Sequence, residues 1–160
     1  MREMRRKKQA LSDFECIEIL ENSTSGVLAL LGDEDYAYAV PLSYVYDDGI
    51  IYFHCAKEGH KIDAIKKHDK VSFCVVAQDD VKKEKYTTYF KSVIAFGRIS
   101  IMTDEKEIFS AIHTLAKKYF PEDTEAGRQA AVNKEYAGLC MLKLKIEHLS
   151  GKQATELLKK

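Results

Sequence analysis

The sequence predicts an α+β fold in which mainly antiparallel strands form a barrel and helices lie at its flanks. Six apolar segments of strand length follow one another, and an early return of the chain is marked by Asp47, Asp48 and Gly49, which is a strong hairpin-turn signal. Helical periodicity interrupts these strands. No βαβ alternation is visible, and neither GxGxxG nor GxxxxGK[ST] occurs, so a nucleotide-binding parallel sheet is not expected.

The N-terminal half contains most of the predicted barrel strands. Ser12 or Asp13 can cap the first helix, and Ile62 and Ile65 lie on one face of the second. Residues 70–78 are apolar at nearly every position, which predicts a strand buried on both faces. In order, the predicted elements are a helix, three strands, a helix and a strand, over residues 12–23, 25–35, 36–46, 50–56, 58–68 and 70–78.

The C-terminal half completes the pattern. The segment over 86–102 is predicted to be one long strand, or two strands joined at a bulge near Gly97. The helix predicted after the long strand has an apolar face and ends before Pro121. Residues 123–136 are compatible with another helix. The predicted elements are a charged loop, the long strand, the two helices and a strand of alternating pattern, over residues 79–85, 86–102, 108–120, 123–136 and 138–149.

Length and charge limit the classes of function. At 160 residues we expect one domain over 1–160, with a basic N-terminal arm over 1–11 and a polar tail over 150–160. The 25 basic and 25 acidic residues cancel, so nothing indicates a nucleic-acid partner. The basic start "MREMRRKK" is not followed by the apolar stretch of a secretory signal. No apolar run approaches the roughly 18 residues of a membrane span.

The cysteines and histidines do not predict a metal site. Cys16, Cys55, Cys74 and Cys140 form no CxxC pair, and most lie in apolar stretches, which favours a reducing, cytoplasmic setting. The histidines form no HExxH motif or Cys/His cluster, so we expect no bound metal.

The stretch "YFHCAKEGHKIDAIKKH", residues 52–68, runs from a strand into a helix through Gly59. A glycine there lets the backbone approach a ligand closely, and the free N–H groups of a helix start attract anions. Lys61 lies in the first helical turn, where a cation opposes the helix dipole unless an anion is bound. His54 and His60 can add hydrogen bonds. The alternative is an ordinary turn with a solvated histidine and lysine.

The preceding strand has one small face and one large face. Its odd positions carry small residues that include Ala39, Pro41 and Ser43, and its even positions carry Tyr38, Leu42 and other large residues. A small face lets a planar ring or a neighbouring subunit lie against the backbone. Pro41 fits an edge or a ligand-lined position, because it lacks a ladder N–H. The strand and the corner together suit FMN, with its ring at one end and its phosphate at the other. The alternative is a packed core strand with a proline bulge.

These residues also resemble the flavin-binding split-barrel proteins related to pyridoxamine 5′-phosphate oxidase, and most closely the nitroimidazole-resistance branch. The similar segments are "MRRKK", the block from "YAVPLSYVYDDG" through "GHKIDAIKKHDKVSFCVV", "YFKSVIAFGRI" and the final "HLSGK". They span nearly the whole chain, and the middle block is the specific part. The resemblance implies a homodimeric, six-stranded split β-barrel with flanking helices and with FMN near the subunit interface.

Carried over by position, the resemblance also implies which residues hold the cofactor. Lys61 is the main phosphate cation, and Arg5 or Arg6 of the arm covers the site. His54 is the candidate catalytic residue, and its alternative is a half-buried histidine bonded to a backbone carbonyl. The resemblance places Pro41, Leu42, Ser43 and Tyr44 at the border of the flavin ring, and His54, Cys55 and Ala56 along the flavin on the next strand. It places Gly59, His60 and Lys61 at the phosphate, and Ser92 and Val93 on the long strand, from which they approach the cofactor.

The implied activity is oxidoreduction, in which a nicotinamide donor reduces FMN and a small oxidised acceptor such as a nitroimidazole is reduced in turn. The alternative is a non-catalytic module that binds flavin or handles heme. The arginine-rich pattern of a pyridoxamine phosphate oxidase substrate site is not visible, so the resemblance does not extend to oxidation of a phosphorylated vitamin.

Overall fold

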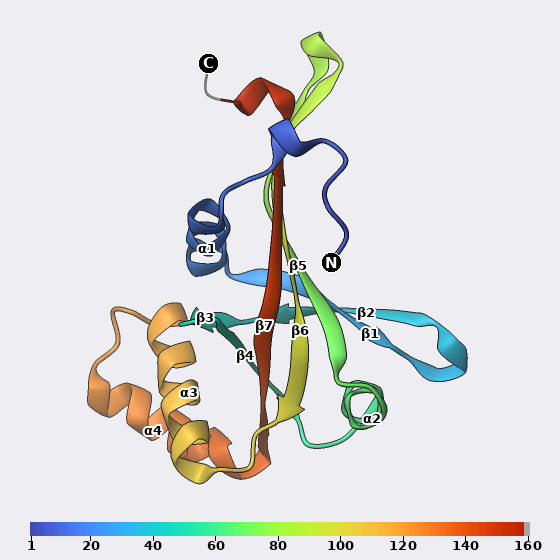
Figure 1. The fold of residues 1–160 in the computed structure, drawn as a ribbon. Coiled ribbons are helices and arrows are strands. Elements are labelled where there is room, and N and C mark those ends of the chain that lie inside the picture. Colours follow the sequence, from blue (N-terminus) through green and yellow to red (C-terminus); the bar gives the residue numbers. More distant parts are fainter. Residues whose placement is uncertain (159–160) are drawn as a thin grey trace.

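The computed structural model describes residues 1–158 and contains one antiparallel sheet that curls into a barrel, with helices on its outside (Figure 1). The predicted α+β class is confirmed. The helices are α1 (Asp13–Asn22), α2 (His60–Lys67), α3 (Glu105–Tyr119) and α4 (Glu125–Glu135). The strands are β1 (Ser25–Leu31), β2 (Ala37–Ser43), β3 (Val45–Asp47), β4 (Ile50–Ala56), β5 (Lys70–Lys82), β6 (Thr87–Ile101) and β7 (Leu139–Gln153).

The order of the strands explains the shape of the barrel. The sheet runs β2-β1-β5-β6-β7-β4-β3, and every neighbouring pair is antiparallel. β2 and β3 therefore lie at opposite edges of the sheet, although only Tyr44 separates them in the chain. A single residue can connect the two edges only if the sheet bends round until they meet. The barrel is therefore split at this seam, where the chain continues across but no ladder joins β2 to β3.

The sheet has seven strands, where the sequence predicted six. The difference arises in residues 36–46, which were expected to form one strand and instead form β2 and β3. The break falls at Tyr44, whose backbone N–H donates to the Tyr119 hydroxyl at 2.9 Å rather than to a neighbouring strand. Its side chain is fully buried, and its own hydroxyl donates to the Leu20 carbonyl at 2.8 Å. Long-range contacts at one residue thus divide the segment.

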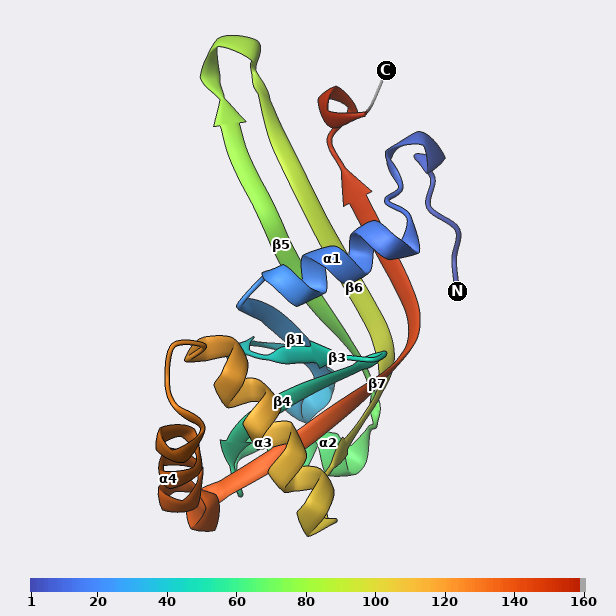
Figure 2. The same cartoon turned by 90° about the vertical axis from the view of Figure 1, so that its left-hand side faces the viewer.

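β5 and β6 extend beyond the barrel as a two-stranded arm (Figure 2). The predicted charged loop over 79–85 was wrong for its first four residues, because β5 continues to Lys82 and only Lys83–Lys85 forms the turn. The arm is supported at its base by the two ends of the chain. Ala10 pairs with Lys152, and the Ala154 N–H donates to the Phe90 carbonyl at 2.9 Å. The predicted N-terminal arm and C-terminal tail are thus partly built into the sheet.

Of the two alternatives for 86–102, the single long strand is confirmed, and the irregularity expected near Gly97 lies within it. The register between β6 and β7 shifts between Phe96 and Gly97. A Cβ atom at Gly97 would lie 2.0 Å from the Lys145 carbonyl oxygen, which no side chain can tolerate without moving the backbone. Glycine therefore allows β6 to bend tightly against β7, and a bend of this kind is needed to curl the sheet.

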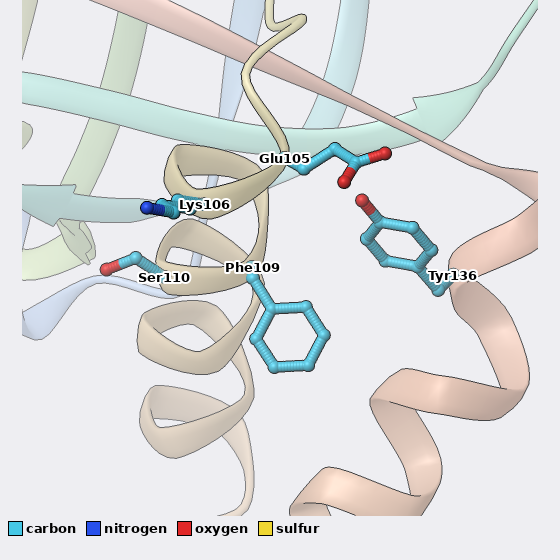
Figure 3. A pocket seen from close by; sticks show the side chains of 5 residues that line it. All are labelled: Glu105, Lys106, Phe109, Ser110 and Tyr136. Atoms are coloured by element: carbon cyan, nitrogen blue, oxygen red, sulfur yellow. The ribbon is translucent and has the colours of Figure 1, made fainter.

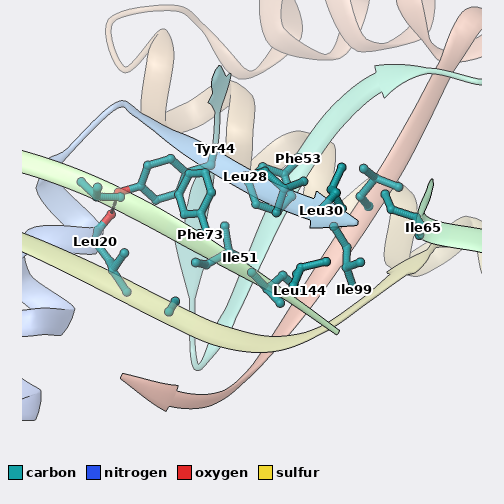
Figure 4. Close-up of a cluster of buried hydrophobic side chains, with 14 of the residues drawn as sticks. Leu20, Leu28, Leu30, Tyr44, Ile51, Phe53, Ile65, Phe73, Ile99 and Leu144 are labelled. Atoms are coloured by element: carbon teal, nitrogen blue, oxygen red, sulfur yellow. Dashed lines mark hydrogen bonds between the residues drawn. The ribbon is translucent and has the colours of Figure 1, made fainter. Parts of the chain in front are cut away.

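Two apolar clusters stabilise the fold. The larger one fills the barrel and includes Leu28, Phe53, Phe73 and Leu144, all fully buried (Figure 4). Phe73 contacts both Tyr44 and Phe53 edge to face, with ring centroids 4.8 and 5.0 Å away. The smaller cluster joins α3 and α4 to the outside of the sheet through Met102, Ala111, Ile112, Val132 and Met141.

The strand over 70–78 is not buried on both faces, which corrects that prediction. Val71, Phe73 and Val75 point into the barrel, but Val76 is 63% exposed on the outer face. The apolar pattern extends to both faces, yet the barrel of one chain can cover only the inner one. The outer face of β1 and β5 therefore remains an apolar surface in the single chain.

Candidate functional site

The strand-to-helix corner has the geometry of an anion site. β4 ends at Ala56, and Gly59 stands before α2 with φ 120° and ψ 172°, a conformation that side chains disfavour. No side chain caps α2, so the N–H groups of its first turn are left for another acceptor. Ile62, Ala64 and Ile65 of α2 are buried against the barrel, which fixes the direction in which the helix start points.

Lys61 lies at this helix start, half-buried beside Cys55. Burial raises the pKa of the Cys55 thiol to about 11, and the nearby Lys61 charge acts in the opposite direction. A cation in the first turn of a helix is repelled by the helix dipole. The corner therefore concentrates positive potential where an anionic group can compensate it, as the sequence suggested.

The side chain of His60 is directed to the β1–β2 hairpin instead of standing free in the corner. Its ring stacks on Tyr38 with centroids 4.2 Å apart and 17° between the planes. Its Nε2 accepts a hydrogen bond from the Asp33 N–H at 3.3 Å. The Asp33 carboxylate also accepts a 2.9 Å hydrogen bond from Lys67, which lowers the pKa of that carboxyl. The His60 side chain thus connects α2 to the hairpin. Only the backbone of His60 belongs to the corner at the start of the helix.

β2 presents the small face that the sequence predicted. Ala37, Ala39, Pro41 and Ser43 are exposed on its outer side, while Tyr38, Val40 and Leu42 pack towards the core. β2 is an edge strand, and Pro41 costs no ladder hydrogen bond on its free side. The predicted ring-bordering residues are therefore divided between the two faces, because Leu42 points inward and Pro41 and Ser43 point outward.

Tyr44, also predicted to border the ring, has its side chain in the barrel core. Tyr44 contacts residues of α1 and α3, two helices that the sequence did not connect to the site. The Tyr119 hydroxyl accepts from the Tyr44 N–H and lies 3.0 Å from the Tyr44 carbonyl and within hydrogen-bond distance of the Thr24 carbonyl. Lys118 Nζ lies 4.3 Å from the centre of the Tyr44 ring and donates to the Ser23 carbonyl at 2.6 Å.

We call Tyr44, Lys118 and Tyr119 the seam cluster, because they connect α1, the β2–β3 junction and α3 where the barrel is split. Burial lowers the pKa of Lys118, and the Tyr44 ring beneath it favours the charged form. The helix that carries Tyr119 was expected only to present an apolar face. The spacing of apolar residues carries no information about the partner of a hydroxyl group, so this cluster gave no signal in the sequence.

The candidate residues of β4 alternate between the faces. His54 and Ala56 are exposed on the outside, and Cys55 points inward, opposite Cys140 of β7. His54 borders an apolar cavity of about 200 Å³ between α3, α4 and β7, whose walls include Ile112, Val132 and Met141. The imidazole therefore stands at the edge of an open, mainly apolar cavity, on the opposite face of the strand from Cys55.

Ser92 and Val93 also point in opposite directions. Val93 is fully buried in the barrel, whereas Ser92 is half-buried and pairs with the exposed Val76. The registers place Pro41, Val27 and Cys74 in one row across β2, β1 and β5. Ser92 therefore shares the outer surface of the sheet with Pro41, and the side chain of Val93 does not reach it.

Arg5 and Arg6 lie towards the other end of β7 from the corner. Both are exposed and closely precede Ala10, which pairs with Lys152 near the C-terminal end of that strand, whereas Cys140 at its start lies opposite Cys55. Lys152 is twelve positions after Cys140 along the bent strand β7 (Figure 2), a contour length of roughly 40 Å. Neither arginine covers the corner within one chain.

A hollow of about 670 Å³ lies between α3 and the turn at Tyr136–Gly138 (Figure 3). Glu105, Phe109 and Tyr136 line it, and it contains none of the predicted site residues. In residues 1–158 no group of three or more His, Cys, Asp or Glu side chains could hold a metal ion. No helix within this range is long and apolar enough to cross a membrane.

Comparison with known families gives one match over most of the chain. The family model described as pyridoxamine 5′-phosphate oxidase matches residues 12–153, which include the corner, β2 and all seven strands. No curated protein sequence matches the chain.

Several solved structures have the same fold. A candidate 5-nitroimidazole antibiotic resistance protein from Bacteroides thetaiotaomicron is 16% identical, with a TM-score of 0.77 over 90% of this chain and 86% of that one. An FAD-binding protein from Mesorhizobium loti is 24% identical, with a TM-score of 0.63 over 92% and 98% of the two chains. An FAD- and heme-binding protein from Mycobacterium smegmatis is 20% identical, with a TM-score of 0.76 over 96% and 76%. At these identities the similarity establishes the fold.

Proposed function

Because this chain belongs to the pyridoxamine 5′-phosphate oxidase family, we propose that it is a flavoprotein that binds FMN and passes electrons from a nicotinamide donor to a small oxidised acceptor. The observation that carries the proposal is the uncapped start of α2, with Gly59 before it and Lys61 in its first turn. The structural relatives support a flavin as the cofactor, since two of those described above are FAD-binding proteins.

The corner suits the phosphate of FMN. Backbone N–H groups at the helix start donate to phosphate oxygens, and the Lys61 ammonium supplies a charge-assisted contact. Gly59 leaves open space in front of them, since a Cβ atom there would meet no atom within 4 Å. We assign the phosphate to Gly59, His60 and Lys61, with His60 contributing its backbone N–H.

The outer face of β2 suits the flavin ring. Ala39, Pro41 and Ser43 leave the backbone accessible to a flat molecule, and β2 contacts β4, which leads to the corner. Ala56 and His54 line the path between the two on the outside of β4. A bound FMN supplies the electron-transfer chemistry, and the chain orients it and excludes water from it. We propose that His54 holds the acceptor, because its imidazole lies at the rim of the apolar cavity beside β4.

We also propose that two chains associate over the outer face of β1, β5 and β6. Val27 and Val76 are 37% and 63% exposed there, next to the half-buried Cys74. An apolar sheet face of this kind is rarely left open to water. We extend the proposal to the N-terminal arm of the partner chain at this site, since Arg5 and Arg6 of the same chain lie towards the other end of β7. Light scattering at micromolar concentration should give the mass of a dimer, and a monomer would contradict the proposal.

The cofactor is tested by purifying the protein, adding FMN and removing the unbound excess. We expect the retained protein to have the visible absorption of oxidised flavin. If Lys61 pairs with the phosphate, Lys61→Ala should lose about 1.5–3 kcal/mol of binding, or roughly 10- to 150-fold in Kd. Lys66→Ala is the matched control, because it removes the same charge from an exposed position five residues further along α2. Equal affinities for the two variants would reject the phosphate assignment.

Turnover is tested separately from binding. We expect NADH or NADPH to bleach the bound flavin in a stopped-flow experiment, and a nitroimidazole to restore its colour. His54→Ala should slow the second step more than it weakens FMN binding. A flavin that neither donor reduces would show that the protein is a binding module and not an enzyme. The four free thiols suit a reducing compartment, so we extend the proposal to a cytoplasmic location.

A further inference from the structure

Cys55 and Cys140 lie directly opposite each other across β4 and β7. The register places this pair between His54↔Met141 and Ala56↔Leu139. Residues opposed in an antiparallel ladder have Cα atoms about 4.5–5.5 Å apart, and their side chains point to the same face. A disulfide needs Cα atoms about 4.4–6.8 Å apart. The backbone is therefore already at the spacing that a bridge requires.

The two thiols are also near neighbours. Cys140 contributes to the rise in the pKa of the Cys55 thiol, and the Cys140 thiol lies 3.9 Å from the Met141 carbonyl. Cys140 is 9% exposed and belongs to the apolar cluster that fills the barrel, and Cys55 is half-buried and packs against that cluster. Their side chains thus lie next to each other on the inner face of the sheet.

A small reagent can reach the pair. Cys140 lines a cavity of about 490 Å³ between α2, the end of β6 and the start of α3. Lys57 and Lys66 also line this cavity, and Lys61 lies on the other side of the pair, beside Cys55. The Lys61 charge favours the thiolate form of Cys55, which is the form that reacts with oxidants. Burial has the larger, opposite effect on the pKa of this thiol, so we expect a slow reaction at neutral pH.

The other two cysteines provide internal controls. Cys16 is 1% exposed on α1, packed against Gly151, and Cys74 points to the outer face of β5. Neither lies opposite another cysteine in any ladder of the described sheet. The register thus singles out one pair of the four.

We propose that Cys55 and Cys140 form a thiol-oxidation site, in which a hydroperoxide converts the pair into a reversible disulfide. The Cys55 thiolate attacks one peroxide oxygen, the O–O bond breaks, and with the thiol proton the products are a sulfenic acid and water. The Cys140 sulfur then attacks the Cys55 sulfur and displaces its hydroxyl group as a second water. In total two thiols and one hydrogen peroxide give one disulfide and two waters. The bridge does not depend on flavin binding, so the two proposals fail independently.

The test is a map of cysteine pairing in the full-length folded protein. Hydrogen peroxide is added, the remaining thiols are alkylated after denaturation, and the protein is digested with trypsin and a glutamate-specific protease. This digestion places Cys16, Cys55, Cys74 and Cys140 in separate peptides, over 16–18, 35–57, 71–82 and 136–143. We expect peptide 35–57 to be linked to 136–143 within one chain, and dithiothreitol to separate them.

Three samples keep the result decisive. Cys74→Ser should keep the link, and Cys140→Ser should lose it. Protein oxidised in urea should instead give a mixture of pairings, so a selective link in the folded wild type stands even if Cys140→Ser does not fold. The proposal is overturned if all four thiols survive, if the link joins other cysteines or two chains, or if Cys55 is oxidised to sulfinic acid while Cys140 remains free.

Discussion

Tyr119→Phe tests the seam cluster, because it removes one oxygen atom from the point where the barrel is split. That oxygen accepts from the Tyr44 N–H at 2.9 Å and lies near the carbonyls of Tyr44 and Thr24. Tyr44 is fully buried, so its N–H has no access to water once the hydroxyl is gone. A buried donor left without a partner costs about 1–3 kcal/mol, and we expect a loss of about 2 kcal/mol.

The loss is measured by urea unfolding of the wild type and of two variants. For a chain of this size, 2 kcal/mol corresponds to a decrease of roughly 4–8 °C in Tm. Tyr36→Phe is the control, because it makes the same chemical change at a side chain that is 73% exposed and should stay within about 0.5 kcal/mol of the wild type. The seam also positions Pro41 and Ser43, so FMN affinity should fall in Tyr119→Phe. If both variants matched the wild type in stability, the seam would not hold the barrel together.

Two further predictions concern the corner and its support. The Cβ atom added in Gly59→Ala would contact no other atom, so the substitution should cost only the strain of the backbone conformation, about 1–3 kcal/mol. We expect a lower urea midpoint together with weaker FMN binding. An unchanged midpoint would show that φ 120° is not required. The pKa of Asp33 is lowered by Lys67, so this ion pair stabilises the fold at neutral pH and is lost as the pH falls below about 4. In Asp33→Asn, the free energy of unfolding should therefore differ less between neutral and acid pH than it does in the wild type. The same pH profile in both proteins would show that the ion pair does not stabilise the fold.

The sequence predicted the elements whose information is local. The apolar face of Ile62 and Ile65 gave α2 and the side it buries, and the alternation of small and large residues gave the two faces of β2. Gly97 marked the bulge, because only glycine tolerates so close an approach of another backbone. Each of these features depends on spacing or on one residue type.

What could not be predicted depends on contacts between distant segments. β5 continues through Asp79 and Asp80 because β6 pairs with it, although the charged residues there have no strand pattern. The break at Tyr44 depends on Tyr119, which is 75 residues further along the chain. His60 was expected to stand in the corner, but Tyr38 and Asp33 of a neighbouring hairpin engage its ring. Such partners are known only once the fold brings them together.

The sequence predicted which strands form the candidate site. It did not predict which face of each strand the site residues occupy. The resemblance named Leu42, Tyr44, Cys55 and Val93 with their neighbours, and the structure directs these four side chains into the barrel. Consecutive strand residues always point to opposite sides, so a contiguous run of predicted contacts includes inward residues. The outward set, which contains Pro41, Ser43 and His54, is the one that can touch a flat ligand with its side chains.

The most direct test of the account compares the binding of FMN and riboflavin to the wild type and to Lys61→Ala. The two ligands share the ring and differ by the phosphate that the start of α2 is proposed to hold. We expect the wild type to bind FMN far more tightly than riboflavin, and Lys61→Ala to reduce that preference by roughly 10- to 150-fold. Riboflavin binding as tightly as FMN, or a preference that Lys61→Ala leaves unchanged, would contradict the assignment of the corner.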